Sequence, residues 1–131
     1  MARYKTIAVV GISRNENKPS QRVPRYLKEK GYTVIGVNPA AEGKILGEKV
    51  YPSLREIPQK IDIVEIFRPS ADVPPVVDDA IAIGAKVVWM QEGIINEEAA
   101  NKARAAGLEV VMDLCMLKVH QTSFITITEK S

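Results

Sequence analysis

Two kinds of hydrophobic pattern alternate along the chain: short continuous apolar runs, and stretches with apolar residues three to four positions apart. Short runs that are almost continuously apolar and rich in Val and Ile are typical of strands buried on both faces of a sheet. They span Thr6–Val10, Thr33–Val37, Asp62–Phe67, Lys86–Met90 and Glu109–Met112. Stretches with apolar residues three to four positions apart, each closed by a glycine, predict helices between the strands. They span Ser20–Lys30, Asp72–Ile83 and Glu97–Ala106.

The order strand, helix, strand predicts crossover connections between parallel strands. We therefore expect the fold class α/β: a single Rossmann-like doubly wound domain with a mainly parallel sheet of about five strands.

Two segments depart from this alternation. Residues 38–61 hold several glycines and prolines, which predicts loops with at most one short helix near Ser53–Glu56. After the last strand we expect a helix around Leu114–Val119. The Thr/Ile alternation at Ser123–Thr128 is typical either of an extra strand or of a partner-binding tail. We expect one domain over residues 1–131, with 113–131 as a helical or extended tail.

Composition narrows the class of protein. With 131 residues and 46% hydrophobic side chains, the chain suits one core. It holds no run of about 18 apolar residues, so we expect a soluble protein. A lone cysteine, Cys115, fits a cytoplasmic location, since it leaves no pair for an internal disulfide.

Charge is unevenly distributed along the chain. Residues 1–30 carry eight Lys and Arg against two acidic residues, which suits a phosphate-bearing ligand. The chain has no dense Lys/Arg run and no aromatic-rich strand for stacking bases, so nucleic acid is disfavoured.

Ligands of open parallel sheets bind outside the carboxyl ends of the strands. The residues at these ends are polar or include Gly or Pro. They are Gly11–Asn15, Asn38-Pro39, Arg68-Pro69-Ser70 and Gln91-Glu92-Gly93.

The first of these loops leads into a helix, for which Ser20 is the predicted N-cap. Backbone N–H groups and the helix dipole there could hold a diphosphate, although Gly11 can equally serve only a tight turn. The dinucleotide fingerprint Gly-x-Gly-x-x-Gly fails, because Ser13 and Glu16 occupy the second and third glycine positions. Asn38 stands where a nicotinamide-dinucleotide site places an acid.

Two cations are candidates for phosphate contacts. Arg68 follows a strand directly and could pair with a phosphate, or could be exposed or salt-bridged. Lys44 lies in the Gly/Pro-rich segment and could reach a phosphate, or could be solvated.

Catalytic groups are scarce. The single histidine, His120, is interpreted as a surface residue, and Cys115 as a buried structural thiol. Glu92 and Asp113 end strands and could act as acid and base, but without a nucleophile or metal partner we interpret both as structural. Large apolar side chains near strand ends are interpreted as core or cleft wall: Phe67, Trp89 and Met90.

Short motifs in a fixed order run through about residues 5–115. They are Val10-Gly11-Ile12-Ser13, Lys18-Pro19-Ser20, Tyr26-Leu27, Gly31-Tyr32-Thr33-Val34-Ile35, Val37-Asn38-Pro39, Leu46-Gly47, Tyr51-Pro52-Ser53-Leu54, Asp62-Ile63-Val64, Phe67-Arg68, Gly84–Gln91, Asn96–Ala99 and Gly107–Asp113. Together they resemble the small stand-alone CoA-binding proteins related to the N-terminal domain of the succinyl-CoA synthetase alpha subunit. Leu114 departs from the pattern, since relatives usually place arginine there, and the residues from Met116 onward do not align.

The resemblance implies coenzyme A as the ligand and a residue-by-residue site. The loop Gly11, Ile12, Ser13, Arg14 and Asn15, with Lys18 beyond it, would hold the diphosphate. Asn38 and Pro39 would border the adenosine, and Lys44 is the candidate for the 3′-phosphate. The remaining path would be lined by Phe67, Arg68, Pro69, Gln91, Glu92 and Gly93.

The resemblance also bears on activity. The synthetase needs a phosphorylatable histidine in a second domain and another subunit, so the chain is expected to bind CoA or an acyl-CoA without catalysis of its own. A protein partner or a homo-oligomer is possible, whereas nucleic acid and membrane are not expected. Two alternatives stay open: an enzyme subunit of acyl-CoA metabolism that uses Cys115 or Glu92, and a nicotinamide-dinucleotide binder.

Overall fold

The chain folds into alternating strands and helices, in the order that the hydrophobic pattern predicts. The computed structural model describes residues 4–40 and 43–122. The elements are β1 (Thr6–Val10), α1 (Pro19–Glu29), β2 (Thr33–Val37), β3 (Lys44–Ile45), β4 (Glu48–Tyr51), the 3₁₀ turn η1 (Leu54–Glu56), β5 (Ile63–Ile66), the 3₁₀ turn η2 (Ser70–Asp72), α2 (Val73–Ala82), β6 (Val87–Met90), α3 (Glu97–Ala105), β7 (Glu109–Met112) and α4 (Met116–Thr122).

One mixed sheet organises the described residues. Its strand order is β3-β4-β2-β1-β5-β6-β7, and every neighbouring pair is parallel except β3 and β4. From β1 the chain proceeds to β2 on one side and returns to β5 on the other. The strand order therefore reverses at the β1/β5 boundary, where open α/β sheets bind their ligands. The prediction of a mainly parallel, doubly wound α/β sheet is confirmed.

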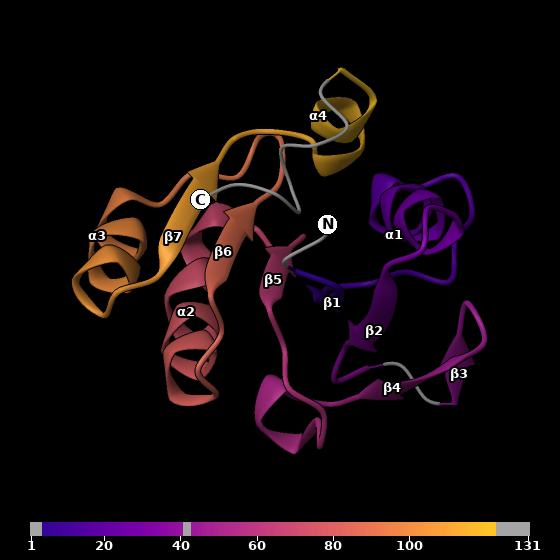
Figure 1. Ribbon diagram of the computed structural model, residues 1–131, viewed down its shortest axis with the longest axis horizontal. Helices are drawn as coiled ribbons and strands as arrows, with labels where there is room; N and C mark the ends of the chain where they lie inside the picture. Colours follow the sequence, from indigo (N-terminus) through magenta and orange to yellow (C-terminus); the bar gives the residue numbers. More distant parts are fainter. Residues whose placement is uncertain (1–3, 41–42, 123–131) are drawn as a thin grey trace.

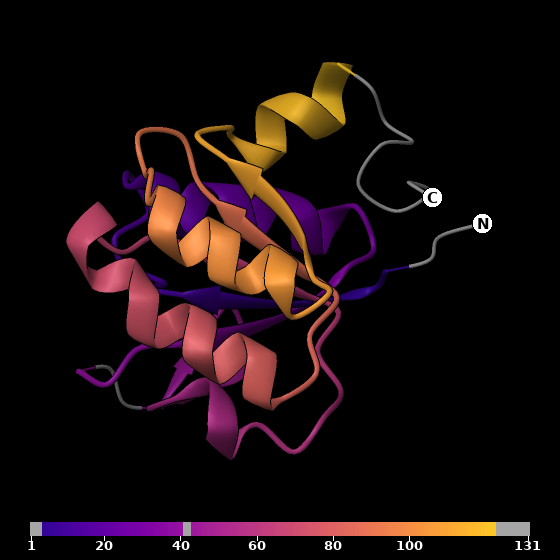
Figure 2. The same cartoon turned by 90° about the vertical axis from the view of Figure 1, so that its left-hand side faces the viewer.

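Helices cover both faces of the sheet. Figures 1 and 2 show α1 and α4 on one face and α2 and α3 on the other. Alternate residues of each strand supply the two cores, because successive side chains point to opposite faces. In β1, Ile7 and Val9 pack on the α1/α4 face, whereas Ala8 packs on the α2/α3 face.

The predicted helix ends are also confirmed. α1, α2 and α3 each end two residues before a glycine in a left-handed conformation, as expected of a glycine C-terminal stop. These glycines are Gly31, Gly84 and Gly107.

The prediction for residues 38–61 was partly wrong. The short helix near Ser53–Glu56 is present as η1, but the expected loop before it contains the hairpin of β3 and β4. Its two-residue turn places Leu46 and Gly47 at φ 55° and 79°, which matches the twist of antiparallel strands. The sheet consequently has seven strands among the described residues instead of about five.

Contacts with a distant helix hold this hairpin. The Lys28 ammonium of α1 donates to the carbonyl oxygen of Leu46 and lies 3.9 Å from a carboxylate oxygen of Glu48. Ile45 and Val50 bury their side chains in the α1/α4 core. Strands of two and four residues are too short to show a hydrophobic period, so the sequence pattern did not predict this hairpin. Its contacts with α1 and with the α1/α4 core stabilise it instead.

After β7 the chain forms the expected helix, α4, slightly later than predicted. The Thr/Ile alternation at Ser123–Thr128 lies outside the described residues. In the described part of the chain, every helix is too short or too polar to cross a bilayer.

Candidate functional site

The loop after β1 packs directly against the end of β5. Gly11 has φ 91°, and a Cβ built there would lie 3.0 Å from the carbonyl oxygen of Phe67. The Gly11 N–H donates to the carbonyl oxygen of Val37 at 2.8 Å. Because a side chain at this position would be strained and would collide with the neighbouring backbone, glycine keeps the ends of β1, β2 and β5 close together.

The Asn38 side chain ties the ends of β1 and β2. Its Nδ2 donates to the carbonyl oxygen of Ile12 at 2.9 Å, and its Oδ1 accepts from the N–H of Ala40 at 2.9 Å. Ile12 in turn lies over Gly36 of β2, where an added Cβ would come within 2.8 Å of Ile12 Cγ2. Asn38 and Gly36 therefore position the first loop, a role that the sequence did not reveal.

The first turn of α1 has no side-chain cap. The N-cap is Lys18, not Ser20 as predicted, and its side chain accepts no backbone N–H. Pro19 occupies the first helical position, where its fixed φ suits a helix start, which moves the start one residue ahead of Ser20. The partial positive charge of the helix start is thus left for another anion.

A cavity of about 390 Å³ opens in front of this turn. It is lined by Gly11, Ile12, Ser13, Arg14, Lys18, Ser20, Asn38, Ala40, Ile45 and Phe67. We call it the loop cavity. Arg14 also reaches across it, since its Nη1 donates to the carbonyl oxygen of Lys44 at 2.7 Å. Two cationic side chains, the Gly11 backbone and the start of α1 therefore converge on one space.

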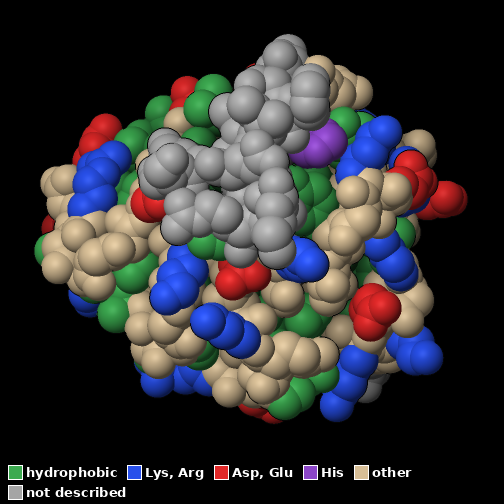
Figure 3. Space-filling view, viewed as in Figure 1, with side chains coloured by type: hydrophobic (Ala, Val, Ile, Leu, Met, Phe, Trp, Pro, Cys, Tyr) green, Lys and Arg blue, Asp and Glu red, His purple; other side chains and the backbone are tan. Residues whose placement is uncertain are grey.

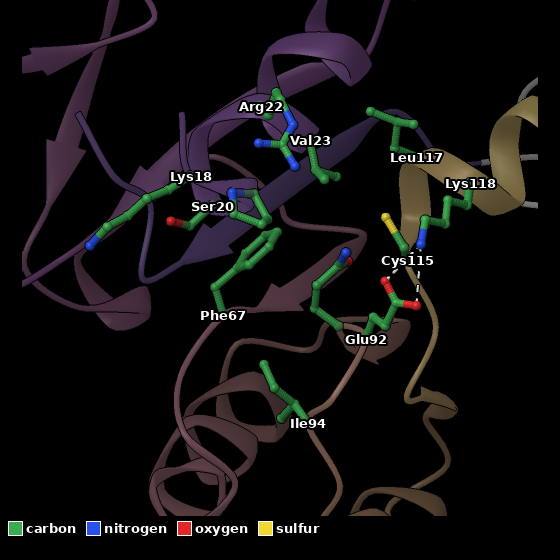
Figure 4. A pocket seen from close by; sticks show the side chains of 12 residues that line it. Lys18, Ser20, Arg22, Val23, Phe67, Glu92, Ile94, Cys115, Leu117 and Lys118 are labelled. Atoms are coloured by element: carbon green, nitrogen blue, oxygen red, sulfur yellow. Dashed lines mark hydrogen bonds and ion pairs between the residues drawn. The ribbon is translucent and has the colours of Figure 1, made fainter. Parts of the chain in front are cut away.

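A second cavity of about 560 Å³ adjoins the first and shares Lys18, Ser20 and Phe67 with it. We call it the inter-helix cavity, because α1 and α4 both contribute to its walls. Its remaining lining residues are Pro19, Arg22, Val23, Gln91, Glu92, Ile94, Cys115, Leu117 and Lys118. Figure 4 shows Phe67 and Cys115 on opposite sides of this space.

Polar groups of the inter-helix cavity connect β6 to α4. Gln91 is 4% exposed, and its Oε1 accepts from the N–H of Met116 at 3.2 Å. Glu92 forms an ion pair with Lys118 at 3.1 Å, which raises the pKa of the ammonium. α4 is thus held over the ends of β5 and β6 by groups that lie at the cavity wall.

A third cavity, of about 320 Å³, lies against α2 and η1 and includes Pro39 and Arg68. Arg68 is half-exposed, and its Nη2 is 3.7 Å from a carboxylate oxygen of Asp72, so the salt-bridged interpretation holds. Apolar and proline side chains supply most of its other walls: Val10, Val37, Pro52, Leu54, Ala71, Pro75 and Val76.

The predicted binding residues therefore divide among adjoining spaces. The loop cavity holds Gly11, Ile12, Ser13, Arg14, Lys18, Asn38 and Phe67, and the inter-helix cavity adds Gln91 and Glu92. Lys44 lies exposed on β3, Pro69 precedes η2, and the Gly93 N–H donates to Asp113 Oδ1 at 2.7 Å; these three line none of the three cavities.

The structure refines the interpretation of His120 as a surface residue: the side chain is partly exposed but also packs against α1. The ring is half-buried between α4 and α1, where its Nδ1 is 2.7 Å from the Tyr26 hydroxyl and its edge meets Tyr32. Burial, and then the charge of Lys30, lower its pKa. The periodicity of a seven-residue helix could not show which neighbour it meets.

Other structural interpretations are confirmed. Cys115 is buried, Trp89 and Met90 are core residues, and Phe67 forms a cavity wall. Asp113 accepts a backbone N–H, and Glu92 is ion-paired. Figure 3 shows basic and acidic side chains interspersed on one face of the described part of the molecule.

Glu65 is the polar residue that sequence reasoning missed. It lies in β5 beside Val9 of β1 and Trp89 of β6, and its side chain is 0% exposed. Neither carboxylate oxygen has a hydrogen-bond partner in the described residues. Burial raises its pKa from 4.5 to about 8. An acid within the otherwise apolar run Ile63–Ile66 was the available signal.

Comparison with known proteins gives consistent matches. The sequence profile described as "CoA binding domain" matches residues 5–121. The uncharacterized protein YneT of Bacillus subtilis is 40% identical over 120 residues, covering 92% of this chain and 88% of YneT. The structure of a hypothetical protein from Pyrococcus horikoshii is 43% identical with a TM-score of 0.90, covering 93% of this chain and 85% of that one.

A longer enzyme also matches. An ADP-forming acetate–CoA ligase II of Archaeoglobus fulgidus is 35% identical over 101 residues, which are 76% of this chain and 15% of the ligase. The chain thus aligns with one small part of that enzyme.

Proposed function

Because the chain belongs to the CoA-binding domain family, we propose that it binds coenzyme A or an acyl-CoA at the carboxyl ends of its strands, without a reaction of its own. The observation that carries this proposal is the juxtaposition of the loop cavity with the inter-helix cavity. One is cationic and faces an uncapped helix start, and the other is largely apolar.

Coenzyme A fits this pair of spaces. Its diphosphate is an anion that backbone N–H groups and a helix start can bind, and its pantetheine arm is a flexible chain of apolar groups and amides. The diphosphate lies in the loop cavity beside Gly11–Asn15 and Lys18 in this proposal. The arm then passes Phe67 into the inter-helix cavity, toward Gln91 and Glu92.

The other predicted contacts complete the proposed site. The adenosine borders Asn38 and Pro39, Lys44 is the candidate for the 3′-phosphate, and Arg68 is the candidate for a second cationic contact. Pro69 and Gly93 shape the loops without a side chain in the three cavities.

Binding without turnover is supported by what the polar groups at the cavity wall already do. Glu92 is paired with Lys118, and Gln91 holds the start of α4. The activity of the A. fulgidus ligase is not carried over, because the match spans 15% of that enzyme.

Calorimetric titration of ligand-free protein with CoA tests the proposal. We expect saturable one-to-one binding, weakened about tenfold by Lys18→Ala because a charge-assisted phosphate contact contributes about 1.5 kcal/mol. Arg68→Ala should weaken binding in the same direction. Lys60→Ala is the matched control, since Lys60 is exposed and precedes β5, toward the amino ends of the parallel strands and away from their carboxyl ends.

Different outcomes separate the alternatives. Absence of binding would refute the function, and parent-like affinity in both cationic variants would refute the site. Tighter binding of NAD than of CoA would identify a nicotinamide dinucleotide as the ligand instead. Turnover of acyl-CoA that is lost in Cys115→Ala would establish an enzyme instead.

A further inference from the structure

The inter-helix cavity is the larger of the two spaces in the proposed site. Its volume is about 560 Å³, against about 390 Å³ for the loop cavity, and the two meet at Phe67, which lines both. A pocket of that size can hold a drug-sized molecule, whereas the pantetheine arm is one narrow chain. An arm that enters past Phe67 therefore leaves room beyond its terminal sulfur, which is where an acyl-CoA carries its acyl group.

The walls that α1 and α4 give to this cavity are mainly apolar. Val23 of α1 is 2% exposed, and Leu117 of α4 packs against the same core. Figure 4 shows Cys115 and Leu117 on the other side of Phe67 from Lys18, the cation of the loop cavity. The end of the cavity remote from the loop cavity is therefore suited to aliphatic carbon atoms.

The charged groups of the cavity do not favour an acyl group that carries a carboxylate. Glu92 and Lys118 form an ion pair at 3.1 Å at the α4 wall, and Arg22, exposed on α1, donates to the carbonyl oxygen of Asn17. A carboxylate at the end of an acyl chain would approach the like charge of Glu92 and compete with it for Lys118. Like charges brought together in a binding site cost affinity.

Glu65 is an independent indication of how this interior treats a carboxylate. Glu65 and Trp89 precede the cavity residues Phe67 and Gln91 by two positions, so they lie on the same face of the sheet, roughly 7 Å further in. Glu65 is 0% exposed, and neither of its carboxylate oxygens has a hydrogen-bond partner among the described residues. Burial raises its pKa to about 8, so the interior beside the cavity favours an uncharged group.

Resting on the proposed function, we propose that the inter-helix cavity holds the acyl group of an acyl-CoA. It selects neutral aliphatic acyl groups over free CoA and over acyl groups that end in a carboxylate. Leu117 determines this selectivity, because it is an apolar residue of the cavity wall that is only partly buried, so that its size can change without opening a void in the core.

Calorimetric titration of the ligand-free full chain with free CoA, acetyl-CoA, butyryl-CoA and succinyl-CoA tests this. Burial of one methylene strengthens binding about fourfold, so butyryl-CoA, with two more methylenes than acetyl-CoA, should bind roughly tenfold more tightly. Succinyl-CoA has as many acyl carbons as butyryl-CoA but ends in a carboxylate, and it should bind at least about tenfold more weakly than butyryl-CoA.

Variants at Leu117 change the space for the acyl group. Leu117→Trp narrows the cavity and should abolish the preference for butyryl-CoA over free CoA. Leu117→Ala widens it and should shift the preference from butyryl-CoA toward the longer hexanoyl-CoA. Leu114→Trp is the matched control, because Leu114 is 49% exposed and lines none of the three cavities, so this variant should keep the preference of the parent.

The outcomes separate this inference from the proposed function. Equal affinities for free CoA, acetyl-CoA and butyryl-CoA in a parent that binds CoA would overturn the inference alone. So would succinyl-CoA that binds as tightly as butyryl-CoA, or folded Leu117 variants that keep the acyl preference of the parent. Absence of binding to free CoA and to every acyl-CoA would overturn the proposed function instead.

Discussion

Replacing Glu65 with leucine should stabilise the protein, and the gain should grow with pH. The carboxyl is fully buried between Val9 and Trp89 without a described partner. Burial raises its pKa from 4.5 to about 8, so between these values the folded protein holds a proton that the unfolded chain has released. Stability is therefore lost as pH rises through this window.

The size of the effect follows from the shift. Each pH unit costs about 1.4 kcal/mol, which amounts to roughly 5 kcal/mol over the full window and about 3 kcal/mol at pH 7. Leucine has no proton to hold and is of similar size, so Glu65→Leu should recover most of this free energy at pH 7 and little of it near pH 4.5.

Urea unfolding followed by circular dichroism at pH 5, 6, 7 and 8 measures the difference. The difference in unfolding free energy between parent and variant isolates Glu65 from the other titrating groups. Glu29→Leu is the matched control, the same change at an exposed position of α1, and should keep the slope of the parent. If Glu65→Leu also runs parallel to the parent within about 0.5 kcal/mol, the reasoning about this carboxyl is refuted.

Three further variants test the packing of the site. Gly36→Ala should cost about 1–3 kcal/mol in urea unfolding and weaken CoA binding, because its Cβ would press on Ile12, and an unchanged midpoint would contradict this. Asn38→Ala should weaken CoA binding in calorimetry with an unfolding cost of about 1 kcal/mol, since Ile12 loses its hydrogen bond. Tyr26→Phe should lower the free energy of unfolding by about 1 kcal/mol at pH 7.5, because the hydrogen bond between the Tyr26 hydroxyl and His120 Nδ1 is lost. The loss should be smaller at pH 5, because the lowered pKa of His120 means that its protonation already destabilises the folded parent there. Equal losses at both pH values would argue against this hydrogen bond.

Local sequence patterns predicted the structure correctly where it depends on residues within one segment. The strand limits Thr6–Val10 and Thr33–Val37 agree with the structure, and so do the glycine stops after the helices. The rule that ligands meet parallel strands at their carboxyl ends then brought the loop after β1 and the residues Asn38 and Gln91 to one edge.

Local sequence patterns gave wrong or incomplete predictions where contacts with other residues determine the structure. Residues 44–51 form a hairpin because α1 holds it, and Ser20 does not cap α1 because Pro19 already begins the helix. His120 is half-buried because Tyr26 lies opposite, 94 residues earlier in the chain.

The sequence by itself determined the period and the order of the five predicted strands and of the helices between them, and the glycine at the first strand end. These properties depend on the residues within a few positions, where hydrophobic spacing and backbone restrictions act. The tertiary structure alone decided that α4 sits beside α1, that Cys115 and Gln91 border one cavity, and that Glu65 is buried without a partner. These properties are burial and hydrogen bonding between segments far apart in the chain, which no local spacing encodes.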